Sequence, residues 1–258
     1  MHKITKNLQK FYDSAAEKFS GTRQRDWPEF THILNAILAS PRIQSWESGK
    51  VIRILEFGCG DGRLLTYLRK HLTATIEYIG VDISYNLLAI ANKNHPDARW
   101  IHADISTRGQ QIQQETFDII IGVASFHHLP TRDKRNTTLA ALYSGLCYGG
   151  SIILTNRCYS DWFREKFASE IRRALFLSRA TLGYKSAHDI MVPWKNNDWS
   201  LVARRLYHIF SQKELGELLA WGGFTKVEQR YVDSTGGCTS DERQGRNMVS
   251  VGVKSIYA

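Results

Sequence analysis

The chain has 258 residues, 43% of them hydrophobic, and can therefore bury the core of one large domain. Its 34 basic and 25 acidic residues give a formal net charge of +9, which suits either a polyanionic partner or a basic solvated surface. The four cysteines form no C-x-x-C pair, and neither a signal-peptide pattern nor an apolar run of membrane-spanning length is present, so we expect a cytoplasmic protein without a zinc site, disulfides or a membrane span.

Residues 1–48 precede the first predicted strand and are expected to form two helices, near 6–19 and 27–39. The polar stretch SGTRQRDWP joins them and carries Arg23 and Arg25. Because a helical N-terminal cover can face a ligand pocket, these two arginines are candidate substrate-binding residues, with solvated loop arginines as the alternative.

The stretch VIRILEFGCGDG at 51–62 combines a short apolar run, rich in β-branched residues, with three glycines at alternate positions. The run predicts a buried parallel strand, and the glycines allow a sharp turn and close approach to a ligand. The following RLLTYLRKHL predicts a helix whose free N–H groups face that turn. The spacing G-x-G-x-G differs from the dinucleotide fingerprint G-x-G-x-x-G, and Glu56 stands two residues ahead of the first glycine. The stretch thus predicts a nucleotide-type cofactor site, with a purely structural turn as the alternative.

Two later predicted strands also end in an acid. TIEYIGVD ends at Asp82, 20 positions beyond Gly62, where a carboxylate can accept both hydroxyls of an adenosine ribose. ARWIHADI carries Asp104 near its end. The candidate cofactor-binding residues are Glu56, Gly58, Gly60, Gly62, Asp82, Ile83, Asp104 and Ile105.

Five strand-like runs alternate with helices between residues 51 and 158, which predicts a doubly wound α/β sheet. The fourth run, FDIIIGVAS, leads into His127 and His128, and the fifth, GGSIILTNRC, carries Arg157. Since polar residues at the carboxyl ends of such strands meet at one edge, these side chains are expected in the same site.

The segment DWFREKFASEIRRALFLSRA places Phe163, Phe167, Ile171 and Leu175 four residues apart, with arginines on the other faces. It predicts an amphipathic helix with a basic side, which would pack on the core, contact nucleic acid or, more remotely, attach to a membrane. The following HDIMVPWKNNDW is expected to be an irregular loop long enough for a lid. A helix (SQKELGELLAWGGF) and two strands (TKVEQRYVD and NMVSVGVK) then end the chain.

The glycine-rich pattern with its preceding acid resembles motif I of the class I S-adenosylmethionine-dependent methyltransferases. The resemblance implies S-adenosylmethionine as cofactor, with Asp104 near the adenine amino group. It also implies a Rossmann-like, doubly wound, seven-stranded sheet, mostly parallel with an antiparallel last strand. The single domain would comprise an N-terminal helical cover (1–48), a cofactor-binding core (49–158), a helical insertion or lid (159–206), and a C-terminal helix with a hairpin (207–258).

Stretches outside motif I resemble one branch of these enzymes, the tRNA wobble-uridine methyltransferases that esterify a carboxymethyl group on uridine C5. The matching stretches are FYDSAAEKFSGTRQRDWP, FHHLPTRDKRN, HDIMVPWK and RLYHIFSQKELGELL. The resemblance implies a tRNA substrate bound at its anticodon loop, with Arg23, Arg25, His127 and His128 around the target base. It also makes a small zinc-binding activator protein a candidate partner. The chain departs from the family at Asn156-Arg157-Cys158, where an aromatic residue is expected, and in a longer Gly-rich link before the last strand.

The acceptor decides what else the site needs. Methyl transfer is an in-line displacement, so the enzyme mainly holds the reacting atoms in line. A carboxylate, with a pKa near 4, needs no general base but does need a cation, and Arg23, Arg25 and Arg157 are the candidates. A hydroxyl or amine acceptor would instead favour His127 or His128 as the base, and either histidine could stack on the uridine or have only a structural role.

We therefore predict a tRNA methyltransferase that esterifies a carboxymethyl-type group on a wobble uridine, with Arg23, Arg25, His127 and Arg157 as catalytic candidates. One alternative is a small-molecule O- or carboxyl-methyltransferase with the same core. Another is a non-catalytic RNA-binding or activator module, against which the intact motif I acid and glycines argue.

Overall fold

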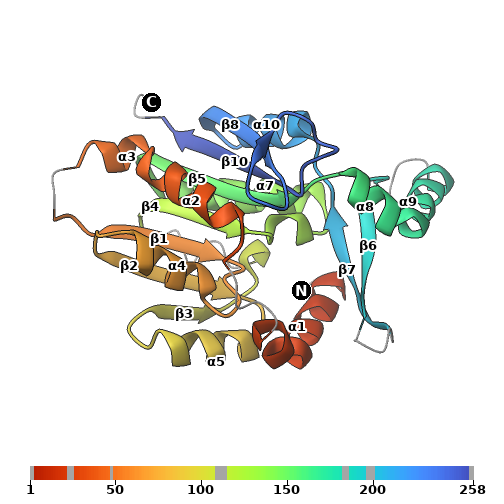
Figure 1. The fold of residues 1–258 in the computed structure, drawn as a ribbon, viewed down its shortest axis with the longest axis horizontal. Helices are drawn as coiled ribbons and strands as arrows, with labels where there is room; N and C mark the ends of the chain where they lie inside the picture. The colour runs from red at the N-terminus through yellow and green to blue at the C-terminus, as the bar shows by residue number, and fades with distance from the viewer. Residues whose placement is uncertain are drawn as a thin grey trace.

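The computed structural model describes residues 3–21, 26–46, 49–107, 115–181, 186–195 and 201–255. Over these residues the chain forms a central sheet with helices on both faces (Figure 1). The strand order is β3-β2-β1-β4-β5-β10-β8-β9. The strands are β1 (Ile52–Phe57), β2 (Ile76–Asp82), β3 (Arg99–His102), β4 (Phe117–Val123), β5 (Leu146–Arg157), β8 (Phe224–Val232), β9 (Cys238–Thr239) and β10 (Asn247–Lys254).

Strands β1 to β5 pair in parallel, whereas β10 runs antiparallel to both of its neighbours, β5 and β8. This confirms the predicted doubly wound sheet with an antiparallel last strand. The described residues add one short strand to the seven that were expected, because Cys238–Thr239 of the Gly-rich link pairs with the end of β8. All seven residues of β4 are buried, as expected of a strand covered on both faces.

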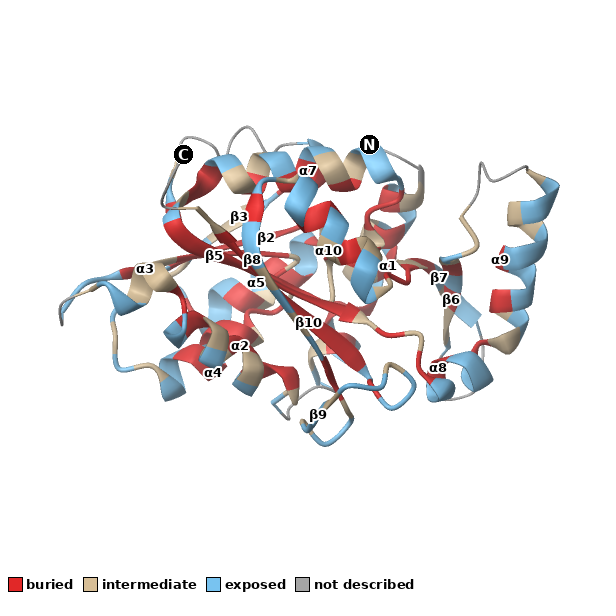
Figure 2. Ribbon diagram, turned by 90° about the horizontal axis from the view of Figure 1, so that it is seen from above, coloured by how far each residue is buried: buried red, intermediate tan, exposed pale blue. Residues whose placement is uncertain are grey.

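The helices of the described residues cover both faces of the central sheet, except for two helices of the insertion, which lie beside it (Figure 2). They are α1 (Lys3–Gly21), α2 (Glu29–Leu38), α3 (Pro41–Gln44), α4 (Arg63–His71), α5 (Tyr85–Asn94), η1 (Phe126–His128), α7 (Arg132–Gly145), α8 (Asp161–Lys166), α9 (Ala168–Ala180) and α10 (Gln212–Trp221). None of them has the length and sustained apolar character that a membrane-spanning helix needs.

Alternating side chains of the central strands supply two cores, one on each face. Ile119 and Ile121 of β4 pack with α2 and α4, whereas Ile120 packs with α7 and α10 on the opposite face. In Figure 2 the buried residues concentrate accordingly in the central strands. This packing fixes the carboxyl ends of β1, β2, β4 and β5, where the site lies.

The insertion differs from its prediction in two ways. The expected single helix is divided at Phe167 into α8 and α9, and Leu175 is 42% exposed while Ala174 is buried. A strict four-residue spacing drifts around a helix of 3.6 residues per turn, so the inward position after Ile171 falls on 174 rather than 175.

The prediction of an irregular loop at residues 188–199 is also wrong. Asp189–Lys195 forms strand β6, which pairs antiparallel with β7 (Leu201–His208) in a separate two-stranded sheet. The sequence carried the signal, because Ile190 and Val192 are buried on either side of the exposed Met191, the two-residue alternation of a half-buried strand. The insertion is therefore half helical and half hairpin, and the hairpin lies beside α1 (Figure 1).

Candidate active site

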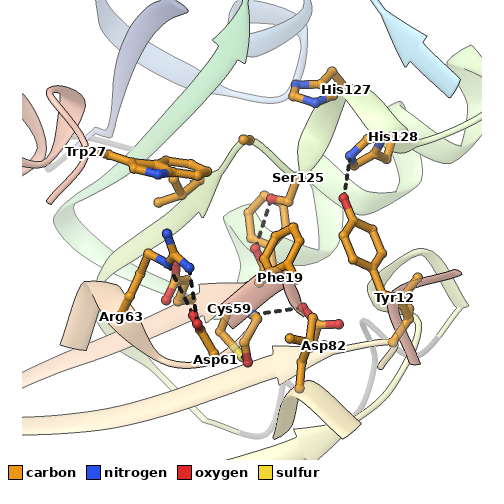
Figure 3. A pocket seen from close by; sticks show the side chains of 18 of the residues that line it. Tyr12, Phe19, Trp27, Cys59, Asp61, Arg63, Asp82, Ser125, His127 and His128 are labelled. Atoms are coloured by element: carbon orange, nitrogen blue, oxygen red, sulfur yellow. Dashed lines mark hydrogen bonds and ion pairs between the residues drawn. The ribbon is translucent and has the colours of Figure 1, made fainter. Parts of the chain in front are cut away.

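A pocket of about 790 Å³ opens at the carboxyl ends of the central strands. The glycine turn after β1 and the acids at the ends of β2 and β3 line one part of it, and α1, η1, β5 and β7 line the other. Figure 3 shows His127 and His128 across this pocket from Asp61 and Asp82. The two parts are called below the cofactor end and the acceptor end.

Each of the three glycines in the turn is needed for a different structural reason. Gly58 and Gly60 both have positive φ, of 68° and 56°, and both line the pocket. A Cβ at Gly58 would collide with the Ser125 side chain, whereas a Cβ at Gly60 would meet no atom within 4 Å and would project into open space. Gly62 is not among the residues that line the pocket, and a Cβ there would lie 2.8 Å from the Trp100 ring. The third glycine thus allows α4 to pack closely against β3.

Asp82 connects the glycine turn to the end of β2. Its Oδ2 accepts a hydrogen bond from the Gly60 N–H at 2.9 Å, and its Oδ1 accepts one from the Ser84 N–H at 2.8 Å. Burial raises the pKa of Asp82, and these backbone N–H donors oppose that rise. Since each carboxylate oxygen can accept two hydrogen bonds, Asp82 keeps free acceptor sites in the pocket. Ile83 follows it and also lines the pocket.

Asp104 has one satisfied and one unsatisfied oxygen. Its Oδ1 accepts hydrogen bonds from the Ser106 N–H at 2.9 Å and from the Ser106 hydroxyl at 2.7 Å. Its Oδ2 is buried and has no hydrogen-bond partner in the described part of the chain. Asp104 and Ile105 both line the pocket. An unpaired buried acceptor is costly, so its position calls for a donor from a ligand.

Glu56, at the end of β1, is 2% exposed and accepts a hydrogen bond from the Tyr78 hydroxyl. Burial raises its pKa to about 8, despite that hydrogen bond. The raised pKa favours the protonated form of this carboxyl group in the free protein.

Arg63 was not selected from the sequence, although it lines the cofactor end. Asp61 holds its guanidinium through two hydrogen bonds, of 3.2 and 3.1 Å, and the Trp27 ring lies 5.3 Å from it. Its remaining nitrogen, Nη1, is buried and has no partner among the described residues. Like Asp104 Oδ2, this atom offers a hydrogen bond that the fold leaves unmade.

His127 lies at the acceptor end and is 1% exposed. Neither ring nitrogen makes a hydrogen bond of good geometry within the described ranges, but the side chain of the neighbouring Asn156 lies close enough to interact with the ring and to oppose the lowering of its pKa. Burial lowers the pKa of His127 well below its usual value, and the charges of Arg157 and Arg205 lower it further. His127 is thus a neutral imidazole with two unused polar atoms in the pocket.

The contacts of His128 indicate a structural role instead. Its Nδ1–H donates to the Leu206 carbonyl of β7 at 2.6 Å, and its Nε2 lies 3.4 Å from the Tyr12 hydroxyl of α1. Burial lowers its pKa to about 3. His128 therefore connects η1, β7 and α1 in its neutral form.

Two guanidiniums line the same end of the pocket. Arg157 ends β5, donates from Nη1 to the Arg246 carbonyl at 3.2 Å, and lies 5.8 Å from the Trp162 ring. Arg205 extends from β7 and was not selected from the sequence, although it belongs to the stretch RLYHIF. Arg23 and Arg25, the other two arginine candidates, lie outside the described residues.

These features fit an adenosine-containing cofactor with a carboxylate tail. The pocket has open space at Gly60, acceptors at Asp82 and Asp104, and a free cationic donor at Arg63. Residues 54–150 match a family described as a methyltransferase domain. Residues 54–150 of this chain therefore form an S-adenosylmethionine-dependent methyltransferase domain.

Similar proteins agree with this family. The methyltransferase is 29% identical over 191 residues to the tRNA (carboxymethyluridine(34)-5-O)-methyltransferase of Saccharomyces cerevisiae, a match covering 72% of this chain and 56% of that one. Its fold resembles that of an S-adenosylmethionine-dependent methyltransferase from Clostridium acetobutylicum, with a TM-score of 0.60, 13% identity and coverage of 97% and 99%. It also resembles a chain of the Haloferax volcanii complex between the Trm112 methyltransferase activator and a methyltransferase, with a TM-score of 0.60, 15% identity and coverage of 97% and 99%. The chain thus spans about half of the yeast relative.

Proposed function

We propose that this methyltransferase esterifies the carboxylate of a carboxymethyl-type group on a wobble uridine of tRNA. A carboxylate oxygen would attack the methyl carbon of S-adenosylmethionine, the carbon–sulfur bond would break with its electron pair going to sulfur, and S-adenosylhomocysteine would leave. The yeast relative, whose name specifies carboxymethyluridine at position 34, supports this acceptor.

The observation that carries the proposal is the charge at the acceptor end. Arg157 and Arg205 are both close enough to His127 to lower its pKa, and both line the pocket. Two cations suit an acceptor that arrives ionised. The two histidines are held neutral with lowered pKa values, which makes them weak bases for a hydroxyl or amine acceptor.

The chain's own residues would hold the cofactor as follows. Asp82 would accept the ribose hydroxyls, Asp104 Oδ2 the adenine amino group, and Arg63 Nη1 would donate to the methionine carboxylate. The cofactor supplies an electrophilic methyl group on a sulfonium. What the protein adds is alignment, because an ionised acceptor requires no proton transfer.

An exposed surface next to the pocket residue Arg157 supports RNA as the acceptor over a free metabolite. Trp162 of α8 is 51% exposed, with Arg157 at 5.8 Å and Lys166 at 4.7 Å from its ring. Exposed aromatic rings flanked by cations are typical of sites that stack single-stranded bases and contact phosphates. A small-molecule methyltransferase would have no use for this surface, and its activity would be insensitive to competing tRNA.

The test is nucleoside mass spectrometry on an anticodon stem-loop RNA with 5-carboxymethyluridine at position 34, incubated with the protein and S-adenosylmethionine. A second arm adds a small zinc-binding activator protein, since such a partner is a candidate and the fold resembles that of a chain in an activator complex. A new methyl ester on that uridine in either arm supports the proposal. No ester in either arm, with cofactor binding shown by calorimetry, would contradict it.

A further inference from the structure

Arg205 is an unusual residue of the acceptor end because its charge is buried without a counter-ion. It is 7% exposed, and no carboxylate of the described chain forms an ion pair with it. Its guanidinium lies against three aromatic rings, at 5.5 Å from Phe11, 4.7 Å from Trp194 and 5.2 Å from Tyr207. These rings come from α1 and from both strands of the insertion hairpin.

The polar contacts of Arg205 are incomplete. Its Nη1 donates to the Tyr12 hydroxyl at 3.4 Å, while its Nε is buried and has no partner among the described residues. Burial opposes the charged form, but Tyr207 and Tyr12 outweigh it and the pKa of Arg205 lies above its usual value. The side chain is therefore a permanent cation whose neighbours are aromatic rings and a hydroxyl group rather than a carboxylate.

Arg157, another guanidinium of the pocket, has different neighbours. Burial lowers its pKa, and the nearby Tyr207 and the charge of Glu29 oppose that shift, while its Nη1 donates to the Arg246 carbonyl. The neighbouring Arg204 is exposed and pairs with Glu170 at 3.6 Å. Among these three arginines, only Arg205 is both buried in the pocket and without a carboxylate that acts on it.

We infer that Arg205 binds the carboxylate of the acceptor and that the insertion hairpin therefore selects anionic over neutral acceptors. The inference rests on the proposed function and names the residue that reads the acceptor's charge. A bound carboxylate would supply the missing counter-ion and accept the hydrogen bond that Nε offers, next to the neutral His127. Hydrogen bonds in which the donor or the acceptor is charged are roughly twice as strong as those between neutral groups.

The test compares two anticodon stem-loop RNAs that differ only in charge at position 34, one with 5-carboxymethyluridine and one with the neutral 5-carbamoylmethyluridine. Binding of each is measured with the full chain in the presence of S-adenosylhomocysteine. We expect the wild type to bind the carboxymethyl RNA roughly 10- to 100-fold more tightly. Arg205→Met should bind both RNAs about equally, while keeping the wild-type affinity for S-adenosylhomocysteine.

Two further variants make the result specific. Arg204→Met removes the adjacent, outward-facing guanidinium and should leave the preference unchanged. Arg205→Lys retains a charge and should retain a clear part of the preference, so it decides the matter if Arg205→Met does not fold. Replacement of a buried charge by methionine of similar volume is often neutral or stabilising, so we expect an unchanged or raised melting temperature.

The outcomes separate the inference from the proposed function. If the wild type esterifies the carboxymethyl RNA but Arg205→Met keeps the same preference and rate, Arg205 does not read the carboxylate, although the proposed function stands. If the wild type esterifies no RNA and shows no preference, the proposed function fails and the assignment of Arg205 fails with it. Loss of preference in a folded Arg205→Lys would also overturn the assignment, because the charge would then not suffice.

Discussion

The two ends of the pocket are built in opposite ways. The cofactor end comes mainly from residues 56–105, a continuous part of the core, and presents acids, backbone N–H groups and the guanidinium of Arg63. The acceptor end joins α1, η1, β5 and β7, which are far apart in the sequence, and presents cations, neutral histidines and aromatic rings. The residues expected to bind the cofactor are thus close together in the sequence. The residues expected to bind the acceptor are brought together only by tertiary packing.

The largest effect should follow from breaking the cofactor end at Asp82. Asp82→Ala removes an acceptor of the ribose hydroxyls and also the acceptor that holds the Gly60 N–H. Each lost hydrogen bond to a charged group costs about 1.5–3 kcal/mol, so affinity for S-adenosylhomocysteine should fall at least 100-fold in calorimetry. Asp97→Ala is the matched control, because Asp97 is exposed and pairs with Arg69 outside the pocket. Equal affinities for the two variants would place the ribose elsewhere.

A smaller and more selective effect is expected at the acceptor end. His127→Ala removes a neutral side chain with two unused polar atoms, so kcat/KM for the RNA should fall roughly 10- to 100-fold, about 1.4 kcal/mol per factor of ten. Affinity for S-adenosylhomocysteine should stay at the wild-type value. If that affinity falls in parallel with kcat/KM, the two ends are not separable.

Asp104→Asn sharpens the comparison within the cofactor end. The substitution keeps the side-chain shape but replaces one carboxylate oxygen with an NH2 group. That group then stands either at Oδ1, where Asp104 accepts hydrogen bonds from Ser106, or at Oδ2, where Asp104 has an unused acceptor. We expect a loss of roughly tenfold in affinity for S-adenosylhomocysteine, which corresponds to about 1.4 kcal/mol for one lost hydrogen bond. A competition assay with inosine in place of adenosine in the cofactor analogue should show that the loss disappears when the amino group is absent. A loss of the same size with the inosine analogue would show that Asp104 does not contact that group.

The smallest effect concerns the attachment of the insertion to the core. His208 of β7 lies 2.6 Å from Asp189 of β6 and 2.8 Å from Glu214 of α10. Burial alone would lower its pKa, but the two carboxylates raise the pKa above the usual value. The stabilisation is therefore complete below about pH 6.5, the ordinary value, and is lost as the pH rises through the raised pKa.

Thermal melting checks this linkage. His208→Gln should lower the melting temperature by about 2–4 °C for each kcal/mol lost at pH 6, and by less at pH 9. His71→Gln, at an exposed histidine of α4, should show no such pH dependence. A deficit for His208→Gln that is equal at both pH values would mean that the charge of His208 contributes nothing.

The contrast between the two ends also explains what the sequence could reveal. The core strands were predictable because both of their faces are buried and they form continuous apolar runs, each followed by its glycine or acid. Arg205 was not predictable in this way. Arg204 and Arg205 point to opposite sides of β7, and only the register of the hairpin decides which of them is buried. Since the hairpin was expected to be a loop, no face could be assigned.

The roles of the histidines were open for a similar reason. His127 and His128 are adjacent and chemically identical, but His128 donates to the Leu206 carbonyl of β7, whereas the ring nitrogens of His127 make no hydrogen bond of good geometry in the described chain. That difference arises from a strand about 78 residues away. The assignment of Arg23 and Arg25 to the substrate site stays a prediction, because both residues lie outside the described part of the chain.

The most direct test of the account is the pH dependence of single-turnover methyl transfer to the carboxymethyl RNA, at saturating S-adenosylmethionine, between pH 6 and 8.5. The acceptor carboxylate ionises near pH 4, and burial lowers the pKa of both pocket histidines, so the rate should change by much less than tenfold per pH unit. The buried Glu56 of the cofactor end, with a pKa of about 8, is a titration expected in this range, and it would produce a partial change rather than a continuous rise. A rate that rises about tenfold per pH unit would show that the acceptor must first lose a proton, which would contradict an ionised carboxylate as the nucleophile.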